Sequence, residues 1–408
     1  MRRLILHIEP FKTGTSSFQH WLRGNAAVLA DAGLVLPLDL LNANANGAPL
    51  AHAFLAAPAD RTAEQSDLID RFGQFCAAHP DASVILSAER LSQMLLVDGS
   101  FLNEFDPRED DTRRQRAARH LHDAVSTLGF DRIDLLVLIR EQAGFLTSAY
   151  VQKLKTMNAR LDLGARGLEA FPVQRYAESF RQLSDLGFHV IAAPYHSPDR
   201  ALALPERLMA MAGFDGPLRG RVTCDVPRVN VSPGYLTTIG LGHVFWHLET
   251  LSPTPDAAEA DQLRRRLFAI TCAANVEGDG PLTLFAPDQA AAIAARQRRH
   301  LDGIEPWAQG LTAADIAGSF PAHRAQSPLS RNDLGTHERH RIDQWLHGIA
   351  AQVQRDNRLR QLIDPATLSD LDASPPGVHS APQQTAPCLG GTWAAAAPDG
   401  RRPLRQAL

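Results

Sequence analysis

Short apolar runs alternate with longer amphipathic stretches over the first half of the chain. The runs are five to seven residues long and almost entirely aliphatic, which is typical of strands buried on both faces. They predict four strands, at 3–8, 83–87, 133–139 and 188–193. The longer stretches place apolar side chains three or four positions apart and predict helices, at 14–32, 63–78, 113–128, 142–157 and 173–186.

Buried strands that alternate with helices predict an α/β fold. We expect a three-layer α/β/α arrangement in which a central parallel sheet carries helices on both faces, joined by right-handed crossovers. Ligands bind beyond the carboxyl ends of the strands in such a sheet. Three polar segments fall at that edge, namely the loop at 9–16, the turn at 87–92 and the segment that starts at Arg140.

The remaining chain has a different pattern. The stretch 42–52 is rich in Asn, Ala, Gly and Pro and predicts a loop, whereas 235–350 is mainly helical by pattern and contains no clear strand. From about 371 the composition turns to Ala, Pro, Gly and Gln, which bury too little to fold. The expected organisation is an α/β core, a helical extension packed on it and a disordered tail, at 1–235, 236–365 and 371–408.

The loop after the first strand carries the residue types that bind phosphate. Lys12 supplies a charge, Gly14 allows close backbone approach, and the helix that follows directs its first N–H groups outward. Hydroxyls are added by Thr13, Thr15 and Ser16. The order is not that of a Walker A motif, because the lysine precedes the glycine. The alternative is a simple strand-turn-helix corner with Thr13 as its N-cap.

The end of the third predicted strand offers a second anion site. Arg140 stands at the strand end and Ser148 follows eight residues later on the next helix. A guanidinium and a hydroxyl so placed suit a phosphate that they approach from two sides. The alternative is an arginine that pairs with Glu141 or Asp134, together with a serine that faces solvent.

Taken together, these segments resemble the sulfotransferases that use 3′-phosphoadenosine-5′-phosphosulfate (PAPS), and most closely the bacterial branch proposed to act on carbohydrates. The resemblance covers about residues 1–235. Its pieces are His7-Ile8 through Lys12-Thr13-Gly14-Thr15-Ser16 with Gln19, Ser87-Ala88-Glu89-Arg90-Leu91-Ser92, Ile139-Arg140 through Ser148-Ala149-Tyr150 with Gln152 and Lys155, Pro194-Tyr195, and Arg228-Val229-Asn230-Val231-Ser232.

The resemblance implies a P-loop-like core and roles for individual residues. The lysine loop holds the 5′-phosphosulfate, the strand-end arginine and the later serine bind the 3′-phosphate, and a late loop completes the 3′ site. By position, these roles fall to Lys12, Thr13, Gly14, Thr15 and Ser16, to Arg140 and Ser148, and to Asn230 and Ser232. Glu9 departs from the family, which commonly has glycine there, and a carboxylate so close to phosphates is repulsive.

Sulfuryl transfer needs a cation near the leaving phosphate oxygen and a base for the acceptor hydroxyl. Lys12 fits the first role, while Glu89 is the first choice as base and His52 the second. No metal is required by this chemistry. The expected acceptor is a hydroxyl of a glycan or glycolipid. Two alternatives stay open, a P-loop nucleotide kinase or hydrolase and a catalytically inactive nucleotide-binding protein of the same fold.

Composition excludes several other classes of protein. The chain has 408 residues, of which 44% are apolar and 21% charged, and its net charge is −4. The apolar and charged fractions are ordinary for a globular protein. The net charge gives no basic field that would attract nucleic acid. No apolar run is long enough to span a membrane. The four cysteines lie far apart, which fits a reduced cytoplasm. The oligomeric state stays open.

Overall fold

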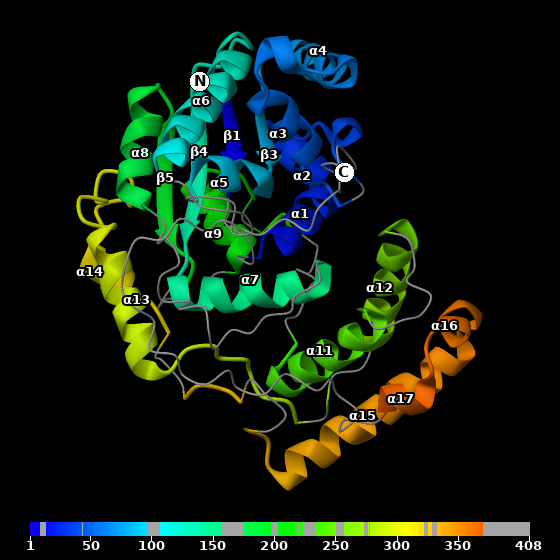
Figure 1. The fold of residues 1–408 in the computed structure, drawn as a ribbon. Helices are drawn as coiled ribbons and strands as arrows, with labels where there is room; N and C mark the ends of the chain where they lie inside the picture. The colour runs from blue at the N-terminus through cyan, green and yellow to red at the C-terminus, as the bar shows by residue number, and fades with distance from the viewer. Residues whose placement is uncertain are drawn as a thin grey trace.

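A five-stranded parallel sheet forms the centre of the computed structural model (Figure 1). The structure describes residues 1–8, 14–42, 44–96, 107–156, 175–196, 203–218, 220–222, 233–249, 257–272, 276, 278–321, 325–328 and 333–369. The strands are β1 (Arg3–His7), β2 (Leu34–Val35), β3 (Ser83–Ser87), β4 (Arg132–Ile139) and β5 (His189–Pro194). Their order across the sheet is β2-β3-β1-β4-β5.

Helices make up most of the remaining described chain. Those of the first half are α1 (Thr15–Gly24), α2 (Ala26–Asp31), α3 (Ala48–Leu55), α4 (Ala63–Ala78), α5 (Glu89–Leu95), α6 (Pro107–Ser126), α7 (Gln142–Thr156) and α8 (Tyr176–Asp185). Those of the second half are α9 (Leu204–Met211), α10 (Asp215–Leu218), α11 (Tyr235–Glu249), α12 (Ala257–Cys272), α13 (Pro287–Arg299), α14 (Ala313–Gly318), α15 (Thr336–Arg355), α16 (Asn357–Leu362) and α17 (Pro365–Ser369). Among the described helices, none combines the length and apolar character needed to cross a bilayer.

Strand β1 is central and pairs with both β3 and β4. Its last residue, His7, lies opposite Ser87 on one side and Leu136 on the other, so β1 and β3 end level with each other. Strand β4 continues to Ile139, which pairs with Pro194 of β5. The end of β4 therefore projects about 10 Å beyond the end of β1, at about 3.3 Å per residue.

Helices cover both faces of the sheet, as the alternation of apolar strands and helices predicts. One face of the strands packs on α3, α4, α5, α6 and α8, and the other packs on α1, α2, α9 and α10. The chain moves in opposite directions across the sheet after β1 and after β4. Right-handed crossovers then require the connecting helices to lie on opposite faces, which is where α1 and α8 are found.

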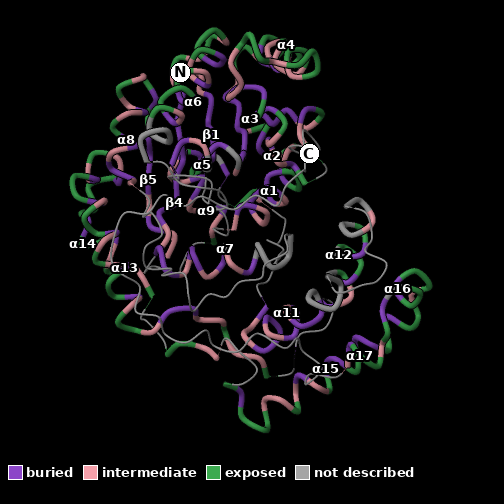
Figure 2. The backbone as a smooth tube through the Cα atoms, viewed as in Figure 1, coloured by how far each residue is buried: buried purple, intermediate pink, exposed green. Residues whose placement is uncertain are grey.

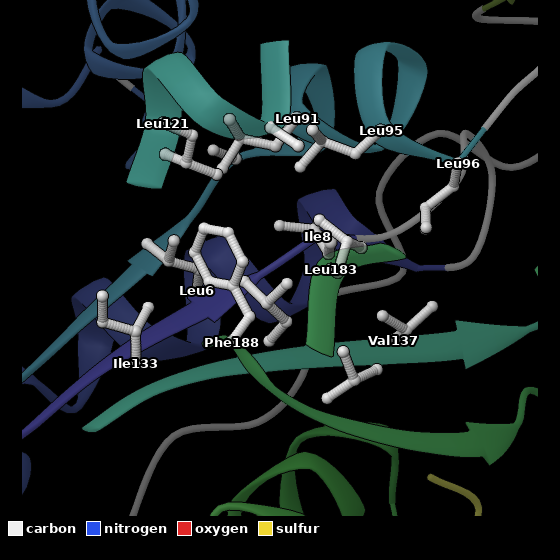
Figure 3. Packing of buried hydrophobic residues seen from close by; sticks show 14 of the residues in the cluster. Leu6, Ile8, Leu91, Leu95, Leu96, Leu121, Ile133, Val137, Leu183 and Phe188 are labelled. Carbon is white, nitrogen blue, oxygen red and sulfur yellow. The ribbon is translucent and has the colours of Figure 1, made fainter. Parts of the chain in front are cut away.

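Figure 3 shows the core on the first of these faces. Leu6 and Ile8 at the end of β1 lie below α5, and Leu121 of α6 lies over the same region (Figure 3). All three side chains are fully buried. Figure 2 shows the strands as buried, with exposed residues gathered on the outer turns of the helices. Burial of this kind contributes about 25 cal/mol for each Å² of apolar surface removed from water.

The helices after β5 pack in two ways. A separate hydrophobic cluster joins α11, α12, α15, α16 and α17. By contrast, Leu301, Ile304 and Ile316 belong to the same core cluster as the sheet, and α13 packs on α7. The outer edge of β5 is also covered from this segment, because the Ala192 N–H donates to the carbonyl oxygen of Trp307 at 2.7 Å. In Figure 1, α7 crosses below the carboxyl ends of the strands.

Four details differ from the sequence-based prediction. The predicted helix 14–32 is broken at Asn25, where the side-chain amide donates to the Trp21 carbonyl oxygen at 2.9 Å. A two-residue strand, β2, was not predicted. The predicted loop 42–52 is wrong in its second half, because α3 begins at Ala48 with a proline in its first turn. The segment predicted as a turn at 87–92 contains the start of α5.

A buried carboxylate joins three strands at the amino end of the sheet. Asp134 is fully buried and lies 3.1 Å from the Arg3 guanidinium, 2.6 Å from Nε of Arg132 and 2.9 Å from Nδ1 of His189. These residues come from β1, β4 and β5. A charge buried in this way is stable only because its partners are kept in place by the ladder.

We therefore expect Asp134→Ala to lower the free energy of unfolding by about 2–3 kcal/mol, since the change leaves the partly buried guanidinium groups of Arg3 and Arg132 without their carboxylate. Urea denaturation would measure the loss. The matched control is Asp31→Ala, because Asp31 and its partner Arg221 form a 3.3 Å pair in which both side chains are exposed. That change should cost less than about 1 kcal/mol. Equal losses for the two variants would contradict the structural role given to Asp134.

Candidate functional site

The carboxyl ends of β1 and β4 mark the place where the chain leaves the sheet in opposite directions. After β1 it goes to β2 at one edge, and after β4 it goes to β5 at the other. Such a divergence opens a crevice between adjacent strands, and it is where open α/β sheets bind their ligands. The phosphate loop predicted from the sequence follows β1, and Arg140 follows β4.

The start of α1 is built around a glycine that no other residue could replace without strain. Gly14 has φ of 87°, in the left-handed region, and is the N-cap of α1, so the prediction of Thr13 as the N-cap is wrong. A Cβ at this position would overlap the side chain of Leu204, the first residue of α9. Thr15 is buried and Ser16 is partly buried. Glu9, Lys12 and Thr13 lie outside the described residues.

Arg140 packs against the end of β5. Its guanidinium carbon lies 5.4 Å from the centre of the Tyr195 ring. Burial lowers the pKa of Arg140, whereas Tyr195 and Glu141 act in the opposite direction. An arginine stays charged in spite of such a shift, and partial removal from water strengthens its attraction to a bound anion.

The alternative of an arginine paired with Asp134 and a serine that faces solvent is wrong, for two reasons. Ser148 is buried on α7, with 6% of its surface exposed. Asp134 lies at the opposite end of β4, within the cluster described above. Glu141 attracts Arg140 and also caps α7, since its two carboxylate oxygens accept the N–H groups of Ala143 and Gly144 at 2.8 and 2.6 Å.

A continuous set of contacts joins the start of α1 to Arg140. The Leu204 side chain lies over Gly14. One turn further along α9, the Arg207 guanidinium donates to the carbonyl oxygens of Pro194 and Tyr195 at 3.0 and 3.1 Å. The ring of Tyr195 then lies against Arg140. The loop after β1 and the arginine after β4 therefore belong to one region, and α9 connects them.

The two candidate bases lie on neighbouring helices beside the same edge. Glu89 is the first residue of α5 and is partly buried, whereas His52 is an exposed residue of α3 rather than a loop residue. Helices α3 and α5 pack against each other. The start of α3 is tied to the end of β3, because the Gly47 N–H donates to the Ser87 carbonyl oxygen at 2.8 Å.

A buried polar group under the edge consists of residues that belong to the resemblance but to which it assigned no role. Nδ1 of His7 lies 2.8 Å from Oγ of Ser87, and Nε2 of Gln19 donates to the same hydroxyl at 3.2 Å. All three residues are buried, and together they join β1, β3 and α1. The available signal was a polar residue at the last position of two apolar strand runs. This group fixes the point from which the chain after His7 leaves the sheet.

Other candidate residues add no second site. Burial raises the pKa of the Cys76 thiol to about 11, in keeping with a small buried side chain rather than a reactive one. Within the described ranges, no group of three or more His, Cys, Asp or Glu side chains is placed to hold a metal ion. Asn230 and Ser232, predicted to complete the 3′ site, lie outside the described residues.

Comparison with known proteins adds no assignment. No family model, no curated protein and no solved structure matches the chain.

The crowding at Gly14 leads to a stability prediction. Gly14→Ala should destabilise the protein by about 1–2 kcal/mol for the left-handed backbone and by about 1 kcal/mol more for the displacement of the Leu204 side chain. Gly33→Ala is the control, because Gly33 has φ of 78° and a Cβ added there would meet open space. Urea denaturation compares the two. Adding Leu204→Ala should remove the extra loss at Gly14, and a double variant that recovers nothing would refute the proposed contact.

Proposed function

We propose that this chain is a PAPS-dependent sulfotransferase that transfers a sulfuryl group to a hydroxyl of a carbohydrate-containing acceptor. The observation that carries the proposal is the adjacency of β1 and β4. It brings two segments suited to anions to one edge, namely the helix start at Gly14 and the pair Arg140 and Ser148. Two such segments fit a nucleotide with phosphates at both its 5′ and 3′ positions.

The donor groups of the described residues fit such a nucleotide. Gly14 is the N-cap of α1, and the first turn of this helix lies at the positive end of the helix dipole. Thr15 and Ser16 add hydroxyl groups there. Arg140 offers a desolvated guanidinium, and Ser148 offers a buried hydroxyl on the next helix. On this assignment the P-loop-like character of the core lies in the turn from β1 to α1.

PAPS, when bound, supplies the sulfuryl group and a phosphate leaving group. In this proposal the first turn of α1 and Lys12 stabilise negative charge on the 5′ side, while Arg140 and Ser148 bind the 3′-phosphate. Glu89 accepts the proton of the acceptor hydroxyl, and His52 is the second candidate for that role. The acceptor is a glycan or glycolipid.

Binding of the product 3′-phosphoadenosine-5′-phosphate (PAP) tests the nucleotide. Isothermal titration should give tighter binding of PAP than of ATP or of AMP, which lacks the 3′-phosphate. Arg140→Ala should weaken PAP binding about 10–100-fold, because a hydrogen bond to a charged group contributes about 1.5–3 kcal/mol. AMP binding should not change. The control is Arg221→Ala, since the Arg221 side chain is exposed.

Preference for ATP would favour the alternative of a nucleotide kinase or hydrolase. Tight PAP binding without sulfate transfer to any acceptor would favour the inactive nucleotide-binding protein. A panel of glycans, glycolipids and phenols with labelled PAPS identifies the acceptor and separates these alternatives.

The proposed base is tested by Glu89→Gln, which should lower the rate of sulfate transfer about 100-fold or more while PAP binding is retained. Glu64→Gln is the matched control, because Glu64 is also an acid in the first turn of a helix, α4. It should leave the rate unchanged. An unchanged rate in Glu89→Gln would exclude this residue as the base.

Lys12→Ala should abolish sulfate transfer, because the variant lacks the cation that is proposed to stabilise negative charge on the 5′ side of PAPS. A near-normal rate of transfer in that variant would exclude the proposed role of the lysine.

A further inference from the structure

A buried glutamine from α13 is bonded to the turn that carries Arg140. Gln297 is fully buried. Its Oε1 accepts the backbone N–H of Gln142 at 2.9 Å, and its Nε2 donates to the backbone carbonyl oxygen of Arg140 at 2.8 Å. Both ends of one side-chain amide are therefore used on two backbone groups that flank Glu141.

These two bonds lie just beyond the end of β4. The Tyr195 N–H donates to the Ile139 carbonyl oxygen at 2.8 Å, which is the outermost bond from β5 to β4. The Gln297 amide bonds the carbonyl oxygen of the next residue, Arg140, and the N–H of Gln142. It therefore ties α13 to the point where β4 turns into α7.

The orientation of the Arg140 side chain depends on this turn. Glu141 caps α7 through Ala143 and Gly144, and a Cβ built on Gly144 would lie 3.7 Å from a terminal nitrogen of Arg140. The guanidinium therefore lies over the first turn of α7, with Tyr195 also beside it. A change in the path of residues 140–142 would move both the guanidinium and the start of the helix that carries Ser148.

The glutamine itself is held by the packing of its helix. Ile293 and Ala290 of α13 pack on Phe145 and Leu146 of α7. At the end of α13, the carbonyl oxygen of His300 accepts the N–H of Ala177 in α8 at 3.2 Å. Because α13 is fixed at both places, the amide of Gln297 meets the turn in a defined position.

We propose that Gln297 is a positioning residue of the 3′-phosphate site, so that α13 is part of the nucleotide-binding machinery. The inference rests on the proposed function, because it assigns Arg140 to that phosphate. Gln297 acts through the backbone of Arg140 and Gln142 and does not contact the nucleotide. Its removal should affect nucleotides with a 3′-phosphate and spare those without one.

The test replaces Gln297 by methionine, which has similar volume but makes neither hydrogen bond. Hydrogen exchange of the protein without nucleotide should become faster at residues 142–145 and stay unchanged in β1 and β3. PAP binding should weaken about tenfold, whereas AMP binding should not change. Arg298→Met is the matched control, since Arg298 is the exposed neighbour on the same helix, and it should alter neither quantity.

A second variant guards against a general loss of structure. Gln297→Asn keeps an amide but shortens it by one methylene, so it reaches at most one of the two backbone groups and should give a smaller effect in the same direction. In an Arg140→Ala background, Gln297→Met should cause no further loss of PAP affinity, because both act on one phosphate.

The outcomes separate the two proposals. Unchanged exchange at residues 142–145 in Gln297→Met, or an equal loss of PAP and AMP binding, would overturn the positioning role. Additive losses in the double variant would overturn it as well. A wild-type protein that binds no PAP would instead overturn the proposed function, and the exchange measurement would still decide whether Gln297 fixes the turn.

Discussion

The parallel pairing of β1 with β3 on one side and β4 on the other is the constraint on which the rest of the structure depends. A strand with neighbours on both edges and helices on both faces must be apolar throughout, and Leu4, Ile5 and Leu6 are fully buried. The same pairing determines where the chain leaves the sheet. Because β1 stops at His7 while β4 runs on to Ile139, the loop before α1 begins beside the projecting end of β4.

Strands and helices with a strong local pattern were predicted within a few residues. Strand β3 has the predicted bounds, β1 and β4 differ by one residue at one end, and β5 is shifted by one residue. The local pattern failed to predict elements whose secondary structure depends on tertiary contacts. Strand β2 has two residues and exists only by pairing with β3. Helix α3 begins in a segment whose Asn and Gly residues indicate a loop, because those residues form the turn before Ala48.

The candidate site could be predicted only in part for a related reason. Arg140 and the loop before α1 were singled out because each follows an apolar run. Whether Ser148 faces solvent or is buried depends on packing that its neighbours in sequence do not reveal. Gln297 could not have been found, since it lies 155 residues from Gln142, on an amphipathic helix in which a glutamine is ordinary by pattern. Long-range contacts of buried polar groups leave little trace in a single sequence.

The bond from Ala192 to the carbonyl oxygen of Trp307 has a consequence for biosynthesis. A chain emerging from the ribosome completes all five strands by Pro194, yet the outer edge of β5 gains its cover only after another hundred residues or so have been made. An uncovered strand edge invites pairing with other chains. Folding of the nascent protein therefore has a vulnerable interval between synthesis of the sheet and synthesis of its cover, during which a chaperone that shields strand edges would raise the yield of native protein.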